Sequence, residues 1–450
     1  MHDTRDSFKP SYLINQIRNV FSRLKEPKES KIMITDCMMS AFAMFHLKFP
    51  SLLEFDKARL DEPRVQNIKS MYGVSQVPCD TQMRQRLDDV SWETIPLAIK
   101  SLITILQRSQ NLEFWDTEIK EHGKIVKTKA VSVDGTQFFS SLKIHCKGCL
   151  EKHHKNGDVT YHHQMIVGSI VSVFDKHVFP VLFEPIIKQD GETKNDCERN
   201  ASKRWLKRYR ELYPYMPTTI IEDGLASNAP HIKNLQKAHC RFILNAKQDD
   251  HKFLYDWFLK GEAPDCIDLT ETIDNIKYHY KYMNNVPLND SNFDVRVNVL
   301  MLEIEEQPHL TKRKALKKAS KLQKTKWVWV TDYHLDEDNI RAVSKVGRAR
   351  WRIENQTFQT LKSEKYHFEH NFGHGYKSLS NTLAGLMILA FLFDQILLAF
   401  NKDVQKALEK AGRFSYLTDK LQGLFHWFTI DNLEIFYRAI FEPPKRVKLG

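Results

Sequence analysis

The sequence predicts a mixed α/β protein, because short β-branched runs and longer segments of helical periodicity follow one another through its central part. From about residue 127, three runs of strand type come first, and a strand, helix and strand pattern then continues to Leu244. Before residue 120 and after Gly375, apolar residues recur at helical spacing instead. The chain has 450 residues and is 42% hydrophobic, which is sufficient for two or three packed domains.

Taken in order, the central elements are predicted to form a mixed sheet flanked by helices. The predicted strands cover 131–139, 164–174, 178–183, 218–221 and 241–244, and the predicted helices cover 194–212 and 231–238. The chain from 246 to 326 is longer than one crossover needs. Since 278–282 and 295–304 alternate like strands, we expect an inserted β-rich subdomain there. A strand over 326–332 and a helix over 339–362 return the chain to the core.

These elements divide the chain into five regions. We expect a helical N-terminal domain over 1–120, an α/β core over 125–245 and 327–400, a β-rich insertion over 246–326, and a C-terminal helical region over 401–450. The apolar run 383–393 is short and is followed by Asp394 and Gln395, so it predicts a buried core helix rather than a membrane span.

The charge and cysteine content indicate the compartment and the kind of partner. A net charge of +11 favours an acidic polymer as partner, although scattered surface lysines would give the same number. The first residues lack the apolar run of a secretory signal. Seven cysteines form a sparse, odd set, which is typical of a reduced cytoplasmic protein.

Three acidic residues are the main candidates for chemistry. Asp134 and Asp223 each end a β-branched run and precede a glycine. At the carboxyl ends of strands, such side chains face the ligand crevice of a helix-flanked sheet. Glu354 lies on the predicted helix close to an apolar face, where an acid needs a cation partner, either an arginine or a divalent metal. Three hard oxygen ligands suit Mg²⁺ or Mn²⁺.

The segments around these acids resemble those of bacterial insertion-sequence DDE transposases with a ribonuclease-H-like core. The similarity covers roughly residues 125 to 400, and its motifs are Val133–Thr136, Ile221–Leu225, Arg350–Asn355 and Phe368–Gly375. The resemblance implies that two Mg²⁺ (or Mn²⁺) ions are held by Asp134, Asp223 and Glu354. It also implies an Arg-x-x-x-Glu-x(7)-Lys catalytic helix. Gly347 stands where the family has a tyrosine, and Lys362 lies one position beyond the family's lysine.

The implied activity is cleavage of DNA at insertion-sequence ends and their joining to target DNA by two-metal phosphodiester chemistry. The implied partner is double-stranded DNA, as terminal inverted repeats and as target. The protein is expected to act as a homodimer on DNA in the bacterial cytoplasm, associated with the nucleoid and without a membrane. Two alternatives stay open: a ribonuclease-H-like nuclease without strand transfer, and a non-catalytic DNA-binding protein derived from a transposase.

Basic residues near the proposed site are candidate DNA contacts, because scissile phosphates need cations beside them. They are Arg348, Arg350, Arg352 and Lys362, with Arg84 and Arg86 on a predicted N-terminal helix and a lysine-rich run over 312–326. The alternative is that these helix faces are simply solvated. His370 and His374 are candidates to line the DNA path, although core packing of Phe368 and Phe372 is the simpler account of their segment. The resemblance also implies that 1–120 is the DNA-binding domain and that 125–245 and 327–400 form the catalytic core.

Two further patterns have both a functional and an ordinary interpretation. Cys146 and Cys149 have zinc-ligand spacing, and His153 and His162 are the favoured partners among four nearby histidines. A flexible loop with reduced thiols is the alternative to this structural Zn²⁺ site. Asp332 also ends a predicted strand, but it ranks below Glu354 as the third acid.

Overall fold

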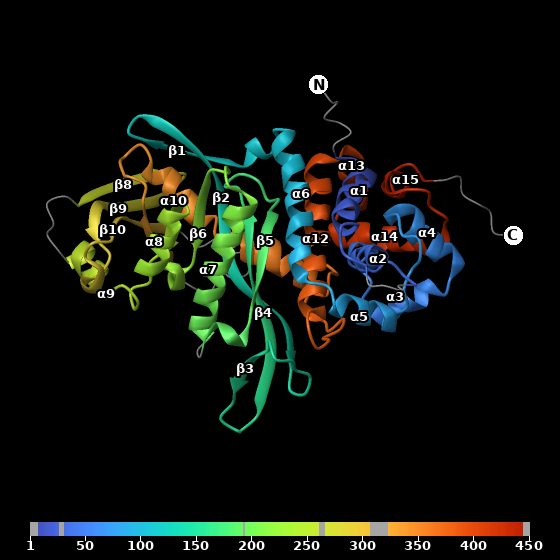
Figure 1. The fold of residues 1–450 in the computed structure, drawn as a ribbon. Helices are drawn as coiled ribbons and strands as arrows, with labels where there is room; N and C mark the ends of the chain where they lie inside the picture. The colour runs from blue at the N-terminus through green and yellow to red at the C-terminus, as the bar shows by residue number, and fades with distance from the viewer. Residues whose placement is uncertain (1–7, 27–30, 192–193, 261–265, 307–322, 444–450) are drawn as a thin grey trace, which may run out of the picture.

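The structure is a computed structural model that describes residues 8–26, 31–191, 194–260, 266–306 and 323–443. Two bodies lie side by side (Figure 1): one is helical and built from both ends of the chain, and the other is built on a sheet from the middle of the chain. The helical body contains α1 (Pro10–Phe21), α2 (Ile34–His46), α3 (Leu52–Arg59), α4 (Glu62–Tyr72), α5 (Asp80–Asp88), α6 (Ile95–Arg108), α12 (Leu379–Phe400), α13 (Lys402–Ala411), α14 (Phe414–Trp427) and α15 (Leu433–Arg438).

Helices α2 and α12 pack against each other at the centre of the helical body. Every residue of α2 is buried, and α12 is buried from Leu379 to Asp394. By length and composition α12 could cross a membrane, yet 78% of its most apolar 18-residue window is buried inside the protein. The apolar run 383–393 is therefore part of a core helix, as its interruption by Asp394 predicted.

A buried ion pair joins the N-terminal and C-terminal helices. Lys48, just after α2, donates a hydrogen bond to Asp394 of α12 at 2.6 Å, and His46 lies 3.3 Å from the same carboxylate. The hydroxyl of Tyr366 also donates to it. Burial alone would raise the pKa of Asp394, but Lys48 and His46 outweigh burial and lower this pKa to about 2. The carboxylate is therefore charged and fully paired inside the helical body.

The described strands form one mixed, 11-stranded sheet. Its order is β3-β4-β2-β6-β7-β11-β10-β9-β8, with β1 beside β2 and β5 beside β4. Strands β2, β6 and β7 are parallel, and the other pairs are antiparallel. The strands are β1 (Asp116–Glu121), β2 (Lys124–Ser141), β3 (Leu150–His153), β4 (Val159–Ile170), β5 (Phe179–Ile186), β6 (Thr218–Glu222), β7 (Arg241–Asn245), β8 (Ile267–Ile273), β9 (Ile276–Pro287), β10 (Arg296–Glu306) and β11 (Gln323–Thr331).

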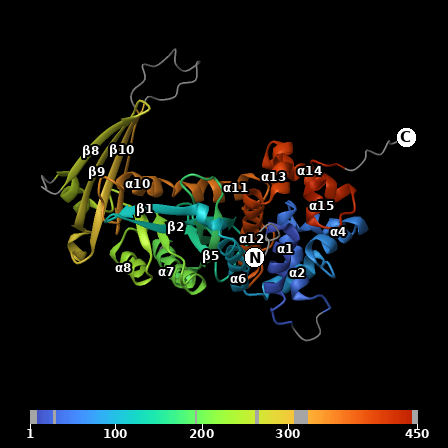
Figure 2. The same cartoon turned by 90° about the horizontal axis from the view of Figure 1, so that it is seen from above.

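The predicted succession of core elements is present. Strands β2, β4 and β5 precede α7 (Lys194–Leu212), and β6, α8 (Ala229–Lys237) and β7 follow. Helices α7 and α8 cover one face of the sheet, and α10 (Ile340–Arg348) and α11 (Gln359–Ser363) lie on the other face (Figure 2). Both faces of the central strands are thus covered, which explains why their sequences are continuous apolar runs.

The region expected to be a separate β-rich insertion is an extension of the core sheet. Strand β11 pairs with β7 of the core on one side and with β10 on the other, so β8, β9 and β10 continue the same sheet. A sequence pattern gives the strands but not their neighbours, and this joining was not predicted. Most of the lysine-rich run over 312–326 lies outside the described residues, but Lys324 and Lys326 lie on β11.

Candidate active site

Asp134 and Asp223 lie beside each other at the same edge of the sheet. Strands β2 and β6 are parallel, and Ser132 of one pairs with Ile221 of the other. Each aspartate is two residues beyond that pair, so both stand at equivalent positions on neighbouring strands. Both also line a cavity of about 420 Å³ between this edge and helices α7 and α8. The structure thus brings together two acids that are far apart in the sequence.

Glu354 reaches the same site from the opposite face of the sheet. The predicted helix over 339–362 is divided into α10, a π-helical turn η8 (Ile353–Phe358) and α11, and Glu354 lies in the π turn. The turn packs on β2 and β4, and Ser132 donates a hydrogen bond to the carbonyl of Arg350 just before it. Such wide turns are frequent at functional sites.

Arg350 connects two of the three acids. Its Nη1 donates to Glu354 Oε1 at 2.7 Å and lies 3.5 Å from Asp134 Oδ2. The cation partner that the sequence required for Glu354 is therefore an arginine in this structure. The guanidinium also fixes the distance between a helix residue and a strand residue, since one nitrogen contacts both carboxylates.

The electrostatics of Asp134 show that one arginine does not neutralise the site. Burial raises the pKa of Asp134 to about 6, and the nearby carboxylates of Glu354 and Asp223 add to the shift. The hydrogen bond from the Gly135 N–H and the charge of Arg350 oppose the shift without cancelling it. The negative charges of Glu354 and Asp223 therefore both act on Asp134, and the cluster has an excess of negative charge.

Asp223 has protein partners of its own. Lys247 Nζ lies 2.6 Å from Asp223 Oδ2, and Asn245 donates to Oδ1 at 3.4 Å. Burial would raise the pKa of Asp223, but hydrogen bonds from Lys247 and the Gly224 N–H lower it below its ordinary value. The sequence analysis missed Asn245 and Lys247. Both directly follow the strand predicted over 241–244, so the strand-end argument used for the aspartates would have found them.

The predicted DNA-contacting residues lie in different surroundings. Arg348 stacks on Trp327 and lines a pocket with Arg350, whereas Arg352 stacks on Trp351 and donates to the carbonyl of Val173, beyond the end of β4. Lys362 pairs with Glu369 at 2.7 Å on α11. On α5, Arg84 is exposed beside Asp80, whereas half-buried Arg86 donates to Glu26 and to the carbonyl of Ile32. Arg86 thus holds parts of the helical body together, and its predicted DNA contact stays a prediction.

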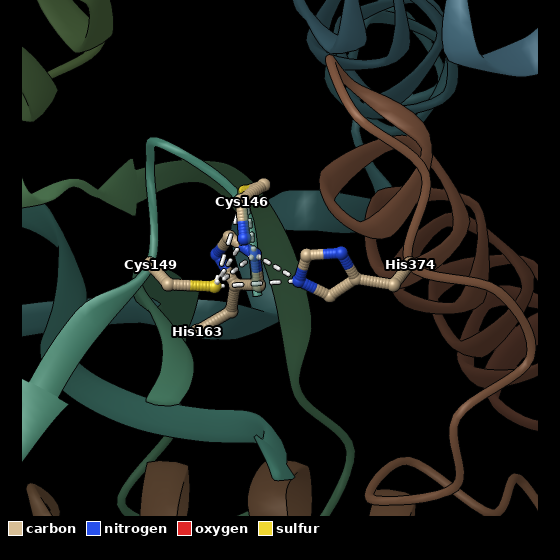
Figure 3. A group of neighbouring side chains, drawn as sticks. All are labelled: Cys146, Cys149, His163 and His374. Carbon is tan, nitrogen blue, oxygen red and sulfur yellow. Dashed lines mark hydrogen bonds between the residues drawn. The ribbon is translucent and has the colours of Figure 1, made fainter. Parts of the chain in front are cut away.

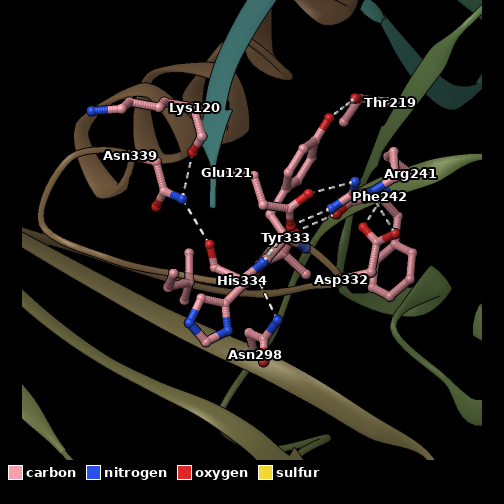
Figure 4. Close-up of polar contacts among 12 residues, drawn as sticks. Lys120, Glu121, Thr219, Arg241, Phe242, Asn298, Asp332, Tyr333, His334 and Asn339 are labelled. Carbon is pink, nitrogen blue, oxygen red and sulfur yellow. Dashed lines mark hydrogen bonds and ion pairs between the residues drawn. The ribbon is translucent and has the colours of Figure 1, made fainter. Parts of the chain in front are cut away.

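Asp332 lies at the other edge of the sheet. Strand β11 is antiparallel to β7, so its carboxyl end is beside the start of β7. There Asp332 pairs with Arg241 at 2.7 Å and accepts the N–H of Phe242 (Figure 4). The same figure shows Arg241 also bound to Glu121 and lying against Tyr333. Asp332 therefore belongs to a local ion-pair cluster with Arg241.

Gly347 has a packing role that explains the missing tyrosine. A Cβ at position 347 would lie 2.7 Å from the indole of Trp329 and 3.1 Å from Ile243. Helix α10 can approach strands β7 and β11 this closely only because position 347 lacks a side chain. A tyrosine there would displace the helix, so any function of that residue in related proteins has no equivalent at this position.

A second cluster, here called the Cys/His cluster, consists of Cys146, Cys149, His163 and His374. Figure 3 shows the four side chains directed toward one another. The two cysteines were predicted, but the favoured histidines were wrong. His153 is solvent-exposed beside Glu151, and His162 points to the opposite face of β4 from its neighbour His163.

The fourth member of this cluster could not be found by spacing. His374 lies in the segment between α11 and α12, more than two hundred residues from Cys149, and its Nε2 is 3.3 Å from the Cys149 Sγ. It was expected on the DNA path but is buried. The pKa of the Cys146 thiol is lowered, chiefly by its hydrogen bond with Cys149, whose own pKa is raised.

Comparison with known proteins gives distant similarity to solved structures only. No family model and no curated protein match this sequence. Among solved structures, the fold is similar to that of a piggyBac transposase in a synaptic complex with hairpin DNA. The TM-score is 0.38 and the sequence identity is 10%, over 99% of this chain and 83% of the other chain. A similarity this distant identifies no activity.

Proposed function

We propose that this protein is a metal-dependent DNA transposase of the DDE class with a ribonuclease-H-like core. The single observation that supports it most is the convergence of Asp134, Asp223 and Glu354, which come from two strands and a helix. The order of strands supports the core assignment. Three antiparallel strands, β5, β4 and β2, are followed by β6 and β7 parallel to β2, with α7 and α8 as crossovers.

The three carboxylates fit a divalent cation. They are hard oxygen donors, and burial together with the charges of Glu354 and Asp223 raises the pKa of Asp134 even with Arg350 present. Bound there, Mg²⁺ would activate the attacking oxygen and stabilise the leaving oxygen of a phosphodiester. The acids' present partners, Arg350 and Lys247, would then turn toward phosphate oxygens of the DNA.

The protein's own groups give this site a pH dependence and a DNA-facing surface. Burial raises the pKa of Asp134 to about 6, so the metal-binding charge of this residue increases as pH rises through the mildly acidic range. Arg348 lines a pocket together with Arg350 and Asn245 on the face that holds η8, where it would bind the DNA backbone beside the scissile phosphate. No serine or tyrosine nucleophile is needed, because the freed 3′-hydroxyl attacks the target. Joining two element ends implies at least a dimer.

The pairing of Arg350 and Lys247 with the acids favours the non-catalytic alternative. A DNA-binding protein descended from a transposase would show the same pairing. The two functions differ in their response to metal: the enzyme requires Mg²⁺ for strand cleavage, and the binding protein shifts DNA mobility equally with or without it.

The test is incubation of the full-length protein with a supercoiled plasmid that contains the DNA flanking its gene on both sides. We expect nicking and joined products with Mg²⁺ or Mn²⁺ and none with chelator. Asp134→Asn, Asp223→Asn and Glu354→Gln should each reduce both products by at least a hundredfold, because each removes a metal-binding charge.

Asp338→Asn is the matched control, because Asp338 is an exposed acid paired with Lys120 away from the site. Its products should equal those of the wild type. Full activity in any one of the three site variants would remove that residue from the proposed site. Cleavage without any joined product would favour the nuclease alternative.

A further inference from the structure

We propose that the Cys/His cluster binds one structural Zn²⁺ ion through Cys146, Cys149, His163 and His374. We further infer that this ion fastens the sheet body to the helical body. The proposal is independent of DNA chemistry, since none of these residues belongs to the acid site.

The spacing of the donor atoms matches a tetrahedral zinc site. Zn–S bonds of about 2.3 Å and Zn–N bonds of about 2.05 Å place the sulfurs about 3.8 Å apart, each sulfur about 3.5 Å from a nitrogen, and the nitrogens about 3.3 Å apart. The observed Sγ–Sγ distance is 3.9 Å, and the Nε2–Nε2 distance is 3.1 Å. Three Sγ–Nε2 distances are 3.5, 3.4 and 3.3 Å. All four atoms lie within 4.8 Å of one another.

The groups around the cluster orient its donors. His374 Nδ1–H donates to the carbonyl of Gly375 at 2.9 Å, which leaves Nε2 unprotonated and directed at the sulfurs. The Cys146 N–H points to the Cys149 Sγ at 3.4 Å, a contact that favours a thiolate. Cys149 N–H in turn donates to the carbonyl of Cys146, which closes the turn between the two ligands.

The segment that presents His374 is held rigidly by the helical body. The carboxylate of Asp88, at the end of α5, accepts the N–H groups of residues 376–379 at the start of α12. These hydrogen bonds lower the pKa of Asp88 although burial opposes them. His374 therefore extends from a fixed backbone toward ligands that belong to the sheet.

The charge balance of the cluster suits its buried position. His163, His374 and Cys149 are buried, and Cys146 is half-buried. Two thiolates and two neutral imidazoles neutralise one Zn²⁺ ion, so binding leaves no net charge in the interior. Without an ion, two Nε2 atoms 3.1 Å apart avoid repulsion between their lone pairs only if at least one of them carries a proton.

The location indicates what the ion would do. Cys146 and Cys149 lie in the loop between β2 and β3, and His163 lies on β4, in the long hairpin that continues from the strand of Asp134. His374 follows α11, which continues from the π turn of Glu354. The ion would therefore tie the chain after the third acid to the hairpin that bears the first acid.

The test is the zinc content of the purified full-length protein, followed by replacement of zinc with Co²⁺. We expect one zinc per chain, and a Co²⁺ spectrum with the strong visible bands of tetrahedral geometry and a thiolate charge-transfer band. Cys149→Ser and His374→Gln should each reduce bound zinc at least tenfold. Chelator should lower the thermal unfolding midpoint of the wild type and leave that of His374→Gln unchanged.

The control variants distinguish the proposed ligands His163 and His374 from His153, which the sequence spacing favoured. Cys266→Ser changes a half-buried cysteine elsewhere, and His153→Gln changes the exposed histidine of the same hairpin; both should keep one zinc per chain. His374→Cys should keep the metal and strengthen the thiolate band, a result that unfolding cannot produce. A wild type with less than a tenth of a zinc after reconstitution, or zinc lost from His153→Gln but kept by His374→Gln, would overturn the proposal.

Discussion

Asp394 and Asp134 differ in pKa, and the more deeply buried of the two has the lower pKa, although burial raises the pKa of a carboxyl group. Asp394 is completely enclosed in the helical body, yet its pKa is lowered to about 2. Asp134 keeps 27% of its side chain exposed at the sheet edge, yet its pKa is raised to about 6. Burial raises the pKa of both, so the difference comes from their partners.

Asp394 has a lysine at 2.6 Å and a histidine at 3.3 Å, with no other carboxylate among the groups that shift its pKa. Asp134 has one arginine at 3.5 Å and two carboxylates near it. A fully paired acid stabilises a fold, whereas an under-paired acid favours any cation that reaches it. The number and charge of an acid's partners therefore distinguish a structural ion pair, as at Asp394, from a candidate metal site, as at Asp134.

The largest effect is expected where pairing is complete. Lys48→Met leaves Asp394 buried without its main cation, which should reduce the free energy of unfolding by about 3–5 kcal/mol. Denaturant unfolding of the full-length protein measures this loss. The double variant Lys48→Met/Asp394→Leu should recover part of it, because no charge then stays buried. A single variant as stable as the wild type would show that the pair is not needed.

Removing Asp134, the under-paired acid, should instead increase the free energy of unfolding. Asp134 binds a proton more tightly in the folded chain than in the unfolded chain, so its penalty grows as pH rises from about 4 to 6. Asp134→Asn should therefore increase the free energy of unfolding more at pH 7 than at pH 4. The difference between the two pH values should be on the order of 2 kcal/mol. Unfolding curves at both pH values give the difference. Mg²⁺ should reduce it, and an equal effect at both pH values would contradict the shift.

The contribution of Asp394 to stability should depend on pH in the opposite direction from that of Asp134. Its stabilisation is complete above the unfolded pKa of about 3.9 and is lost as pH falls toward its folded pKa of about 2. Acid titration of the wild type and of Lys48→Met/Asp394→Leu should thus diverge between pH 4 and 2. Parallel titrations would show that the pair does not titrate in this window.

A smaller change is expected from Arg350→Gln, which removes the cation shared by Asp134 and Glu354. The pKa of Asp134 should rise further, because the charge of Arg350 opposes the shift. The expected loss of stability at pH 7 is about 1 kcal/mol, and added Mg²⁺ should restore it. The measurement is the unfolding midpoint with and without Mg²⁺. A loss that Mg²⁺ does not reverse would argue against a metal at these acids.

The smallest effect is expected at a solvent-exposed pair. Lys120 and Asp338 lie 2.6 Å apart, but half or more of each side chain is exposed. Water and salt screen such pairs, so Lys120→Ala should leave the unfolding curve unchanged within error. A large loss there would mean that distance, rather than burial and partner number, determines how much these pairs contribute.

The sequence predicted the parts of this molecule that depend on local pattern. Helix α7 has the predicted bounds, and Asp223 directly follows the end of β6 as predicted. Asp134 was expected at a strand end but lies inside β2, just past the last residue of β2 that pairs with β6. The joining of β8–β10 to the core sheet was missed, because hydrophobic alternation does not identify a strand's neighbour. His374 was considered only as a candidate to line the DNA path. Its place in the Cys/His cluster was missed, because its partners are distant in sequence and no spacing rule connects them.

The helical body has a consequence for synthesis of the protein. Helix α2, whose residues are all buried, packs on α12, which leaves the ribosome more than three hundred residues later. During that interval the nascent chain has an apolar helix without its native cover, and such surfaces aggregate or recruit chaperones. A chain truncated before α12 would therefore be an insoluble fragment, although all the described strands of the sheet body precede α12.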